Sequence, residues 1–261
     1  MERREFLKKV GAAGLAMPLL SVAGLVRPPS TLAHTRQDVV SAAFTGPKSI
    51  LHCDDGGYYY CTNDIVEGGS KYVVWFGGSI EGTWGNIFVG RPVWNGQILD
   101  YISGKYWDVP YGVTMGNGKL EVTESRGNFY RRSEEDGFGG KTWTKVDREN
   151  HRHLPATIPT ELRRGEGLTG IWITDTKAIY YIRQLGSDVV WFAARPDHGP
   201  ANVFWGNRDG LSVWGQYMDV PWGQTEVTGF LSLEVLEGDD VMVQKRPVNG
   251  GYASTRFIRL S

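Results

Sequence analysis

The chain contains one long segment twice, and this internal duplication constrains its fold more than any other feature of the sequence. Residues 104–112 read Gly-Lys-Tyr-Trp-Asp-Val-Pro-Tyr-Gly, and residues 215–223 read Gly-Gln-Tyr-Met-Asp-Val-Pro-Trp-Gly. The likeness continues upstream, where Asn-Ile-Phe-Val-Gly at 86–90 is answered by Asn-Val-Phe-Trp-Gly at 202–206. The chain is therefore a doubled unit, and its function should follow from what the copies share and where they differ.

Both copies consist of short runs rich in β-branched and aromatic residues that alternate with Gly, Asp and Asn turns, which is typical of β-strands. The expected strands of the first copy are Ser49–Cys53, Tyr58–Asn63, Lys71–Phe76, Gly85–Arg91, Gln97–Asp108, Gly118–Thr123, Asn128–Arg132 and Lys141–Val146. Those of the second copy are Thr169–Ile173, Ala178–Gln184, Asp188–Ala193, Ala201–Trp205, Leu211–Asp219, Phe230–Leu236, Asp240–Lys245 and Ser254–Leu260. No segment between these strands has the spacing of apolar residues that is typical of a helix.

About eight sequential strands joined by short turns favour an up-and-down antiparallel barrel, because closure of the sheet removes its exposed edges. The sequence therefore predicts an all-β protein with two tandem up-and-down antiparallel eight-stranded β-barrels after an N-terminal signal segment. The expected parts are a signal peptide at 1–33, a tether at 34–48, the first barrel repeat at 49–148, a linker at 149–167 and the second barrel repeat at 168–261.

The N-terminus reads as an export signal. Arg3-Arg4-Glu5-Phe6-Leu7-Lys8 resembles the twin-arginine export motif, an uncharged apolar run follows, and Thr31-Leu32-Ala33 offers small residues for cleavage before His34. The alternative is an uncleaved membrane anchor, although the apolar run is short for the ~20 residues that span a bilayer. We expect a protein exported by the twin-arginine route to the periplasm or the outside of the cell, touching a membrane only through an uncleaved signal segment.

Composition agrees with a folded, exported protein. Hydrophobic residues make up 41% of the chain and charged residues 22%, which is enough to build a core. The formal charge is -1 for the whole chain, and the signal segment holds more basic than acidic residues, so the remainder is more acidic. A nucleic-acid partner is not expected, because such partners require a basic patch or stripe.

Leu168-Thr169-Gly170-Ile171-Trp172, which opens the second copy, resembles the Gly-x-Trp first strand of avidin-like and lipocalin-like barrels, the calycin group. The resemblance implies a barrel in which this Trp closes one end. The first copy departs from the motif, since Ser49 and Leu51 stand where the second has Gly170 and Trp172. The resemblance covers one short motif and implies no ligand.

Asp108 and Asp219 are the charged residues that the repeated motif shares. One interpretation places a carboxylate at the mouth of each barrel, where it accepts hydrogen bonds from a ligand or acts as a general base. The other is that an Asp before Val-Pro ends a strand and caps the following turn. Asn86 and Asn202 are also repeated, and either bind a ligand or satisfy backbone groups.

Aromatic residues are frequent in both copies, and aromatic walls with a few polar groups suit a small-molecule pocket. They also suit the packed interior of a small barrel. The candidate ligand-binding residues are Trp75, Asn86, Trp107, Asp108, Tyr181, Trp191, Asn202, Trp205, Trp214, Asp219 and Trp222.

Cysteine and histidine are scarce. Cys53 and Cys61 would face each other across a three-residue turn and form a disulfide, whereas a two-residue turn at Asp55-Gly56 would put them on opposite faces. His151 and His153 alternate in the linker, but no third ligand is fixed by spacing, so no metal is expected. No cofactor-binding motif is present in the sequence, and we expect no cofactor.

The leading hypothesis is an exported protein that binds a small molecule, such as a carbohydrate, through aromatic-lined barrel mouths. One alternative is a barrel enzyme, a lyase, isomerase or hydrolase, with Asp219 or Asp108 as general base; the sequence leaves enzymatic activity undecided and leans against it. The other is a structural or interaction module of the cell envelope.

Overall fold

The computed structural model describes residues 48–65, 71–156, 158, 164–223, 227–236, 238–247 and 252–260. The expected signal segment and all but the last residue of the expected tether lie outside these residues. Every regular element in the described part is a β-strand, and this part holds no helix of the length and apolarity that crossing a bilayer requires.

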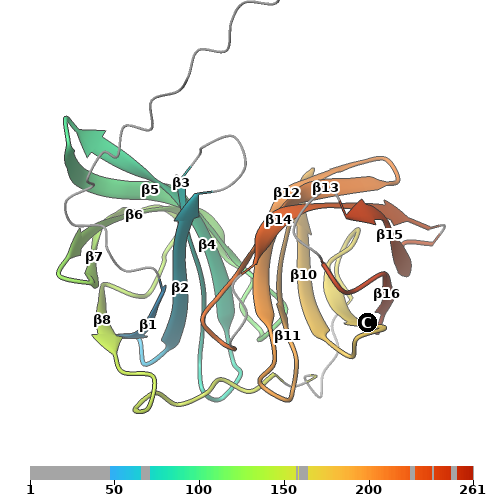
Figure 1. The fold of residues 1–261 in the computed structure, drawn as a ribbon, viewed down its shortest axis with the longest axis horizontal. Coiled ribbons are helices and arrows are strands. Elements are labelled where there is room, and N and C mark those ends of the chain that lie inside the picture. Colours follow the sequence, from blue (N-terminus) through green and yellow to red (C-terminus); the bar gives the residue numbers. More distant parts are fainter. Residues whose placement is uncertain are drawn as a thin grey trace, which may run out of the picture. The chain divides into compact units, whose positions relative to one another are not determined.

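The strands form two closed antiparallel barrels of eight (Figure 1). The first contains β1 (Lys48–Cys53), β2 (Tyr58–Ile65), β3 (Lys71–Gly78), β4 (Gly85–Asn95), β5 (Ile98–Asp108), β6 (Asn117–Ser125), β7 (Asn128–Glu134) and β8 (Thr142–Val146). The second contains β9 (Gly170–Thr174), β10 (Ile179–Leu185), β11 (Asp188–Ala194), β12 (Ala201–Asp209), β13 (Ser212–Asp219), β14 (Thr228–Val235), β15 (Val241–Pro247) and β16 (Arg256–Arg259).

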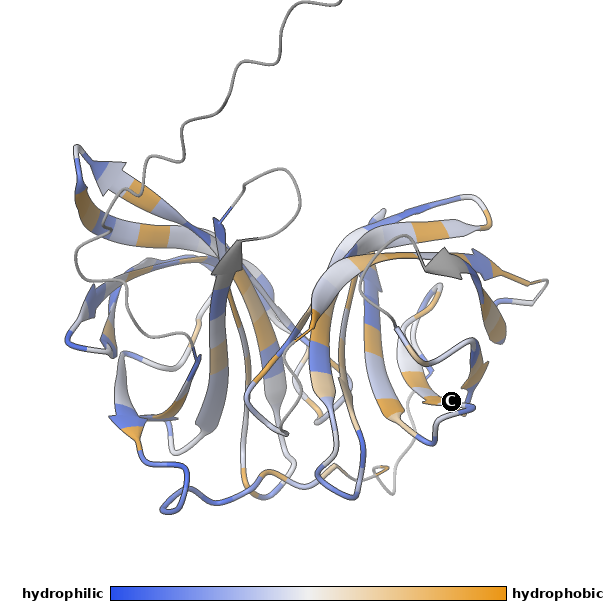
Figure 2. Ribbon diagram, in the orientation of Figure 1, coloured by the Kyte–Doolittle hydropathy of each residue, from blue (hydrophilic) through white to orange (hydrophobic). Residues whose placement is uncertain are grey.

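Each barrel closes by pairing its first strand with its last, β1 with β8 and β9 with β16. All other pairs join strands that are consecutive in sequence, which is the up-and-down order. The predicted fold class is confirmed, with two tandem closed barrels of eight strands each. Period-two alternation of apolar and polar residues, visible as bands along the strands in Figure 2, specifies which side chains enter each barrel.

Large apolar side chains fill the interior of each barrel. Each interior contains a stacked pair of aromatic rings at equivalent positions of the duplication. Trp75 lies on Phe88 with ring centroids 4.1 Å apart, and Trp191 lies on Phe204 at 3.7 Å. All four rings are fully buried. The repeated tryptophans on β3 and β11 are therefore core residues of the barrels.

The glycine that opens the repeated motif is required by close backbone approach. Gly104 and Gly215 each face another glycine on the neighbouring strand. A Cβ atom at Gly104 would lie 2.3 Å from the carbonyl oxygen of Val89, and one at Gly215 would lie 2.3 Å from that of Trp205. No side chain fits at either position without moving the backbone.

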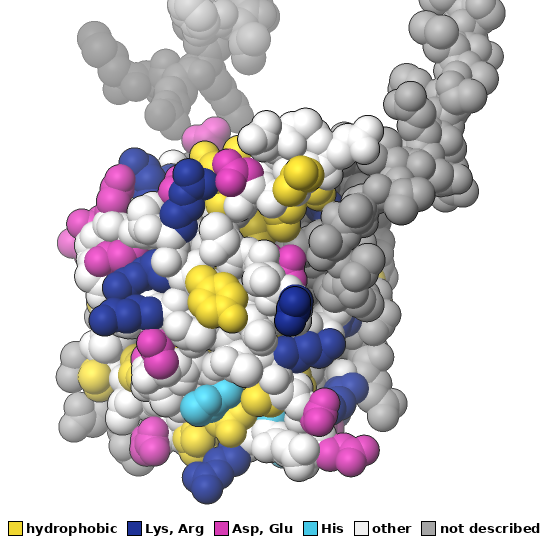
Figure 3. All heavy atoms as spheres, turned by 90° about the vertical axis from the view of Figure 1, so that its left-hand side faces the viewer, with side chains coloured by type: hydrophobic (Ala, Val, Ile, Leu, Met, Phe, Trp, Pro, Cys, Tyr) yellow, Lys and Arg dark blue, Asp and Glu magenta, His cyan; other side chains and the backbone are white. Residues whose placement is uncertain are grey.

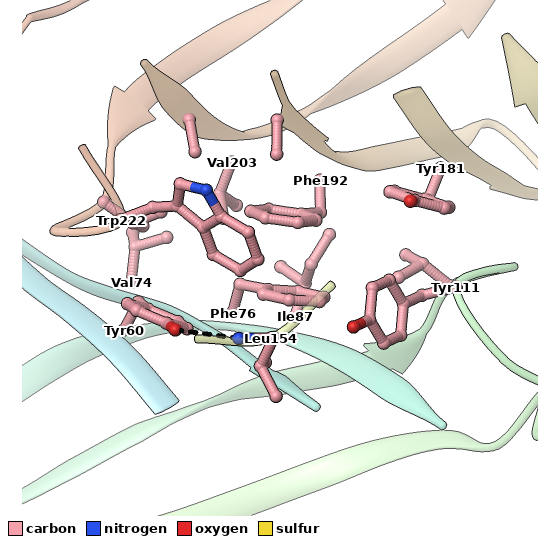
Figure 4. Close-up of a cluster of buried hydrophobic side chains, with 14 of the residues drawn as sticks. Tyr60, Val74, Phe76, Ile87, Tyr111, Leu154, Tyr181, Phe192, Val203 and Trp222 are labelled. Atoms are coloured by element: carbon pink, nitrogen blue, oxygen red, sulfur yellow. Dashed lines mark hydrogen bonds between the residues drawn. The ribbon is translucent and has the colours of Figure 1, made fainter. Parts of the chain in front are cut away.

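A third core lies between the barrels, formed by outward-facing side chains of β2, β3, β4, β10, β11 and β12 (Figure 4). At its centre Phe76 stacks on Phe192, its own counterpart in the duplication, with ring centroids 3.5 Å apart and planes inclined by 1°. Contact between equivalent residues is the mark of an isologous interface around a two-fold axis. The two copies therefore associate like the subunits of a symmetric dimer.

Other contacts across this core obey the same symmetry. Tyr60 packs on Trp222 with centroids 4.9 Å apart, and their counterparts Tyr181 and Tyr111 pack at 5.2 Å. The linker adds Leu154, which is fully buried in the same core and whose backbone N–H donates to the Tyr60 hydroxyl at 3.4 Å. The linker thus contributes to the core that joins the barrels.

The Asp-Val-Pro-aromatic sequence directs neighbouring side chains to opposite sides of the barrel wall. The backbone N–H of Tyr111 donates to Val109 O at 2.6 Å, and that of Trp222 donates to Val220 O at 2.7 Å. This i to i+2 bond is a tight γ-type turn centred on the proline, whose fixed φ suits it. The aromatic residue consequently enters the core between the barrels, while the preceding aspartate stays at the end of the barrel interior.

The far end of the second barrel is closed by Trp172 and Arg259. Trp172 is fully buried and its indole N–H donates to Leu168 O at 3.0 Å. The Arg259 guanidinium lies 5.7 Å from the Trp172 ring centroid and donates to backbone carbonyls, among them Gly167 O at 2.7 Å. Both side chains thus hold the segment that precedes β9.

Candidate binding site at the two barrel mouths

Each barrel has a cavity at the end where the repeated aspartate lies. The cavity of the first barrel, the first mouth, has a volume of about 230 Å³ and is lined by Asp55, Tyr59, Asn86, Tyr106, Asp108 and Asp136, among others. The cavity of the second barrel, the second mouth, measures about 240 Å³ and is lined by Tyr180, Arg195, Asn202, Tyr217, Asp219 and Ser254, among others. Four positions are equivalent in the duplication: Tyr59 and Tyr180, Asn86 and Asn202, Tyr106 and Tyr217, Asp108 and Asp219.

Strand register explains why these four residues converge. Asn86 pairs with Asp108 across β4 and β5, and Asn202 pairs with Asp219 across β12 and β13. Because side chains two positions apart on a strand share a face, the tyrosine that stands two residues before each aspartate enters the same barrel end. The two mouths therefore share a set of two phenols, one carboxamide and one carboxylate at the same barrel end.

The aspartates have a structural role as well as a place in the mouths. The Asp108 carboxylate accepts the backbone N–H of Gly116 at 2.7 Å, and the Asp219 carboxylate accepts that of Val227 at 2.9 Å. Both bonds hold the loop that returns to the next strand. Burial raises the pKa of Asp108, and the hydrogen bond from Gly116 counteracts this in part. The two interpretations of these aspartates are thus compatible, because one side chain caps the loop and lines the cavity.

Two polar atoms of the mouths are buried and, among the described residues, have no hydrogen-bond partner. They are the hydroxyl of Tyr217, whose residue is 2% exposed, and Oδ1 of Asn86, whose residue is 4% exposed. Burial raises the pKa of Tyr217 to about 12, so its hydroxyl stays protonated at neutral pH and keeps a hydrogen to donate. An unpaired buried polar group costs about 1–3 kcal/mol, which a ligand would recover.

Beyond the shared residues the mouths differ in chemistry. In the first mouth the Tyr59 hydroxyl donates to Asp55 at 2.7 Å, whereas the second copy has Thr176 in place of Asp55. In the second mouth the Tyr180 hydroxyl lies 2.7 Å from the Tyr252 hydroxyl and donates to Ser254 Oγ at 3.1 Å. The first mouth is thus rich in carboxylates and the second in hydroxyls.

The structure brings four of the predicted ligand-binding residues into the mouths, namely Asn86, Asp108, Asn202 and Asp219. The other predicted residues lie elsewhere, and the aromatic walls of the mouths are made largely by tyrosines. Trp75 and Trp191 are in the barrel interiors; Trp107, Tyr181 and Trp222 are in the core between barrels, Trp205 packs against that core, and Trp214 is 54% exposed on the outer surface.

Sequence reasoning missed the phenols of Tyr106 and Tyr217 as site residues. The signal was present, because each tyrosine stands two residues before a predicted mouth aspartate on the same strand. Asp55 and Asp136 were also missed, and they lie in turns that the duplication does not share. Turn conformation decides where those side chains point, and period-two alternation says nothing about it.

The expected disulfide is not formed, because Cys53 and Cys61 are separate buried thiols. Cys61 pairs with Ser49, and Cys53 continues the hairpin as far as Gly57, whose carbonyl oxygen accepts its N–H at 2.9 Å. Both thiols enter the barrel interior, but four strand positions separate Cys53 from the residue opposite Cys61, about 13 Å along the strand. This distance exceeds the reach of a disulfide.

The histidines of the linker meet a third histidine from the second barrel. His151 Nε2 lies 3.2 Å from His153 Nδ1, and the His153 ring centroid lies 4.7 Å from that of His198. His151 Nδ1 is 2.5 Å from Arg148 O, so this nitrogen carries the proton. Within the described part of the chain no group of three or more His, Cys, Asp or Glu side chains has the geometry of a metal site.

In comparisons with known proteins, no family model, no curated protein and no solved structure matches the chain.

Proposed function

We propose that this protein binds a small polar molecule in the mouths of its two barrels and acts outside the cytoplasm. The observation that supports this most is that both copies keep the same Tyr, Asn, Tyr and Asp around a cavity at the same end. A barrel that needed only a filled core would place apolar side chains there, as it does at its centre. A few polar groups that converge on a cavity are characteristic of sites that orient a small ligand.

The free hydrogen-bonding capacity of the mouths defines the kind of ligand. In the second mouth Tyr217 offers a donor, and in the first mouth Asn86 offers an acceptor; each atom is buried and unpartnered among the described residues. The Asp108 carboxylate keeps acceptor capacity beyond its bond to Gly116, because an ionised carboxylate accepts about four hydrogen bonds. A molecule that carries several hydroxyl or amine groups, such as a sugar, satisfies such a set.

An NMR titration of the isotope-labelled protein with a panel of sugars and small metabolites tests the proposal. We expect at least one ligand to shift the backbone signals of the loop ends Gly116 and Val227, with little change at the closed end near Trp172. Tyr217→Phe removes one donor at constant shape and should weaken binding in the second mouth about tenfold. Trp214→Phe, on the outer surface of the same strand, is the matched control. Titrations that leave both mouths unchanged for every ligand would argue against the proposal.

An enzymatic function is a second candidate, supported by the raised pKa of Asp108, which lines the first mouth. Burial of this kind is how proteins adapt a carboxyl group for general acid or base chemistry. Asp108→Asn keeps the shape and removes the base. Loss of turnover with an unchanged melting temperature would indicate catalysis, whereas loss of stability alone would indicate the loop-capping role.

The proposed location outside the cytoplasm is based on the signal segment, which lies outside the described residues. Arg3 and Arg4 stand where twin-arginine signals require them. Cell fractionation of the full chain tests this, with Arg3→Lys and Arg4→Lys combined as the variant. Retention of the variant in the cytoplasm, with export of the parent, is the expected result.

A further inference from the structure

The first mouth differs in charge from the second, and we infer that it binds an organic ammonium cation. This inference rests on the proposed function and names the ligand class of one of its two sites. Among the described residues that line the first mouth, three are carboxylates, Asp55, Asp108 and Asp136, and none is Lys or Arg. The second mouth has one carboxylate, Asp219, together with Arg195.

Aromatic side chains add to the attraction for a cation. Four aromatic rings line the same cavity as the three carboxylates, those of Tyr59, Trp84, Tyr106 and Phe138. The face of an aromatic ring carries partial negative charge, and rings that enclose a site bind alkylammonium groups. Rings and carboxylates together select a positive, partly apolar ligand over a neutral polyol.

Basic groups near the first mouth are engaged elsewhere. Arg183 of the second barrel donates to the backbone carbonyls of Asp108, Met115 and Gly116, at 2.5 to 2.9 Å, from outside the cavity. Burial raises the pKa of Asp108, and the charge of Arg183 opposes this rise. Lys119 is paired with Glu135 at 3.2 Å. No basic side chain among the described residues that line the first mouth therefore pairs with its carboxylates.

The outer surface of the first barrel carries charges of both signs. Figure 3 shows the side of the molecule on which the first barrel lies, with acidic and basic side chains interspersed and no large field of one sign. Among the described residues that line the first mouth, all the charged side chains are acidic. A cleft lined by charges of one sign strengthens their interaction with a ligand of the opposite sign.

A second observation shows that the carboxylates belong to a built site. Asn86 is 4% exposed and lines the same cavity, and its Oδ1 has no hydrogen-bond partner among the described residues. This oxygen is an acceptor for an N–H or O–H of the ligand. The volume of about 230 Å³ exceeds the ~30 Å³ of a water molecule several times, so the cavity admits an organic molecule. The carboxylates do not converge on a metal position, since no group of three acidic or other metal ligands with suitable geometry occurs in the described residues.

The test uses choline and its neutral isostere 3,3-dimethylbutan-1-ol, which have the same shape and hydroxyl group and differ in charge. Each is titrated into the isotope-labelled full chain at low and high salt. We expect choline to shift signals of the first mouth, at Gly116 and Gly137, with a dissociation constant at least tenfold lower than that of the alcohol. Higher salt should weaken choline binding, because screening reduces attraction between charges.

Two variants test whether choline binds in the first mouth. Asp136→Asn removes one charge and suits the backbone, because Asp136 has φ of 69° and Asn tolerates this left-handed region. It should weaken choline binding roughly three- to tenfold and leave the alcohol unaffected. Asp209→Asn makes the same charge change on an exposed residue at the far end of the second barrel and should have no effect.

The outcomes separate the two proposals. Equal binding of choline and the alcohol in the first mouth would overturn the ammonium inference and leave a small-molecule site in place. Choline shifts confined to the second mouth would also overturn it. Failure of choline to bind, with binding of a neutral sugar in the first mouth, would overturn the inference alone, and failure of every ligand in both mouths would remove the proposed function as well.

Discussion

Phe76 and Phe192 stack face to face at the centre of the molecule, each against its own counterpart from the other copy. Both rings are fully buried. The contact shows that the duplicated halves meet around a local two-fold axis rather than hanging as separate domains on a linker. Stability of each barrel should therefore depend on the other.

We expect Phe192→Ala to lower the free energy of unfolding by about 3–5 kcal/mol, the range for loss of a buried aromatic ring. The measurement is chemical denaturation followed by tryptophan fluorescence. Leu185→Ala, at a residue 44% exposed on the preceding strand, is the control and should change stability little. If the ring matters only to one barrel, the variant will unfold in two separate transitions; a single transition at lower denaturant supports the coupled interface.

Arg183 joins the second barrel to the loop of the first mouth. Arg183→Met removes three charge-assisted hydrogen bonds to carbonyl oxygens and should destabilise the protein by a few kcal/mol. It should also raise the pKa of Asp108 further, because a nearby positive charge favours the ionised carboxyl. NMR titration of the Asp108 carboxyl carbon measures this shift.

Thr62 is the matched control for Arg183, since it occupies the equivalent position on β2. Its hydroxyl donates to Asp219 O at 2.9 Å, just as Arg183 donates to Asp108 O at 2.9 Å. Thr62→Val loses one neutral hydrogen bond and should cost about 1 kcal/mol without moving the pKa of Asp108. A pKa of Asp108 that is unchanged in Arg183→Met would contradict the electrostatic role of the guanidinium.

Stability should fall in mild acid because of His153. The pKa of His153 is lowered from the ordinary 6.5. Partial burial disfavours its charged form, and so does electrostatic repulsion by His151, His198 and Arg148. A histidine whose pKa is lower in the folded state contributes full stability above about pH 6.5, and this is lost as pH falls through the lowered value.

The free energy of unfolding measured between pH 8 and pH 5 should show this loss, and His153→Gln should reduce it. A His52→Gln variant is the control, because His52 lies on β1 outside the histidine cluster. An identical pH dependence in parent and His153→Gln proteins would show that other groups are responsible.

The two thiols should be inert in the folded protein. Burial raises the pKa of Cys61 to about 12 and also raises that of Cys53, so neither forms the reactive thiolate at pH 8. We expect negligible reaction with a thiol reagent in native buffer and two equivalents in denaturant. Rapid native labelling, or fewer than two equivalents after unfolding without reductant, would show that the thiols are exposed or bridged.

Much of the fold is predictable because both copies carry the same periodic pattern. The duplication singled out Asp108 and Asn86 together with Asp219 and Asn202 as candidates for the barrel mouths, and all four line the cavities. The number of strands followed from the positions of turn residues. Closure of each sheet was expected because an open sheet leaves unpaired backbone N–H and C=O groups at its edges.

The surroundings of the outward aromatic residues were not predictable from the pattern. Trp222 and Tyr181 face away from the barrel interior, and alternation cannot tell whether such a face meets solvent, a ligand or another barrel. Here it meets the other barrel. The register of the hairpin after Cys53 was not predictable either, because the local turn sets it and periodicity does not. Cys61 pairs with Ser49, four residues from Cys53, which keeps the two thiols apart.

The stacked pair of phenylalanines has one more consequence. In an assembly of two identical chains, any substitution enters both halves at once, so a change that suits one binding site is imposed on the other. A single polypeptide that contains both halves is free of that restriction: aspartate can stand at residue 55 while threonine stands at its counterpart, residue 176. Covalent fusion of a symmetric pair thus lets two sites of common origin acquire different ligands while the surface that joins them stays the same.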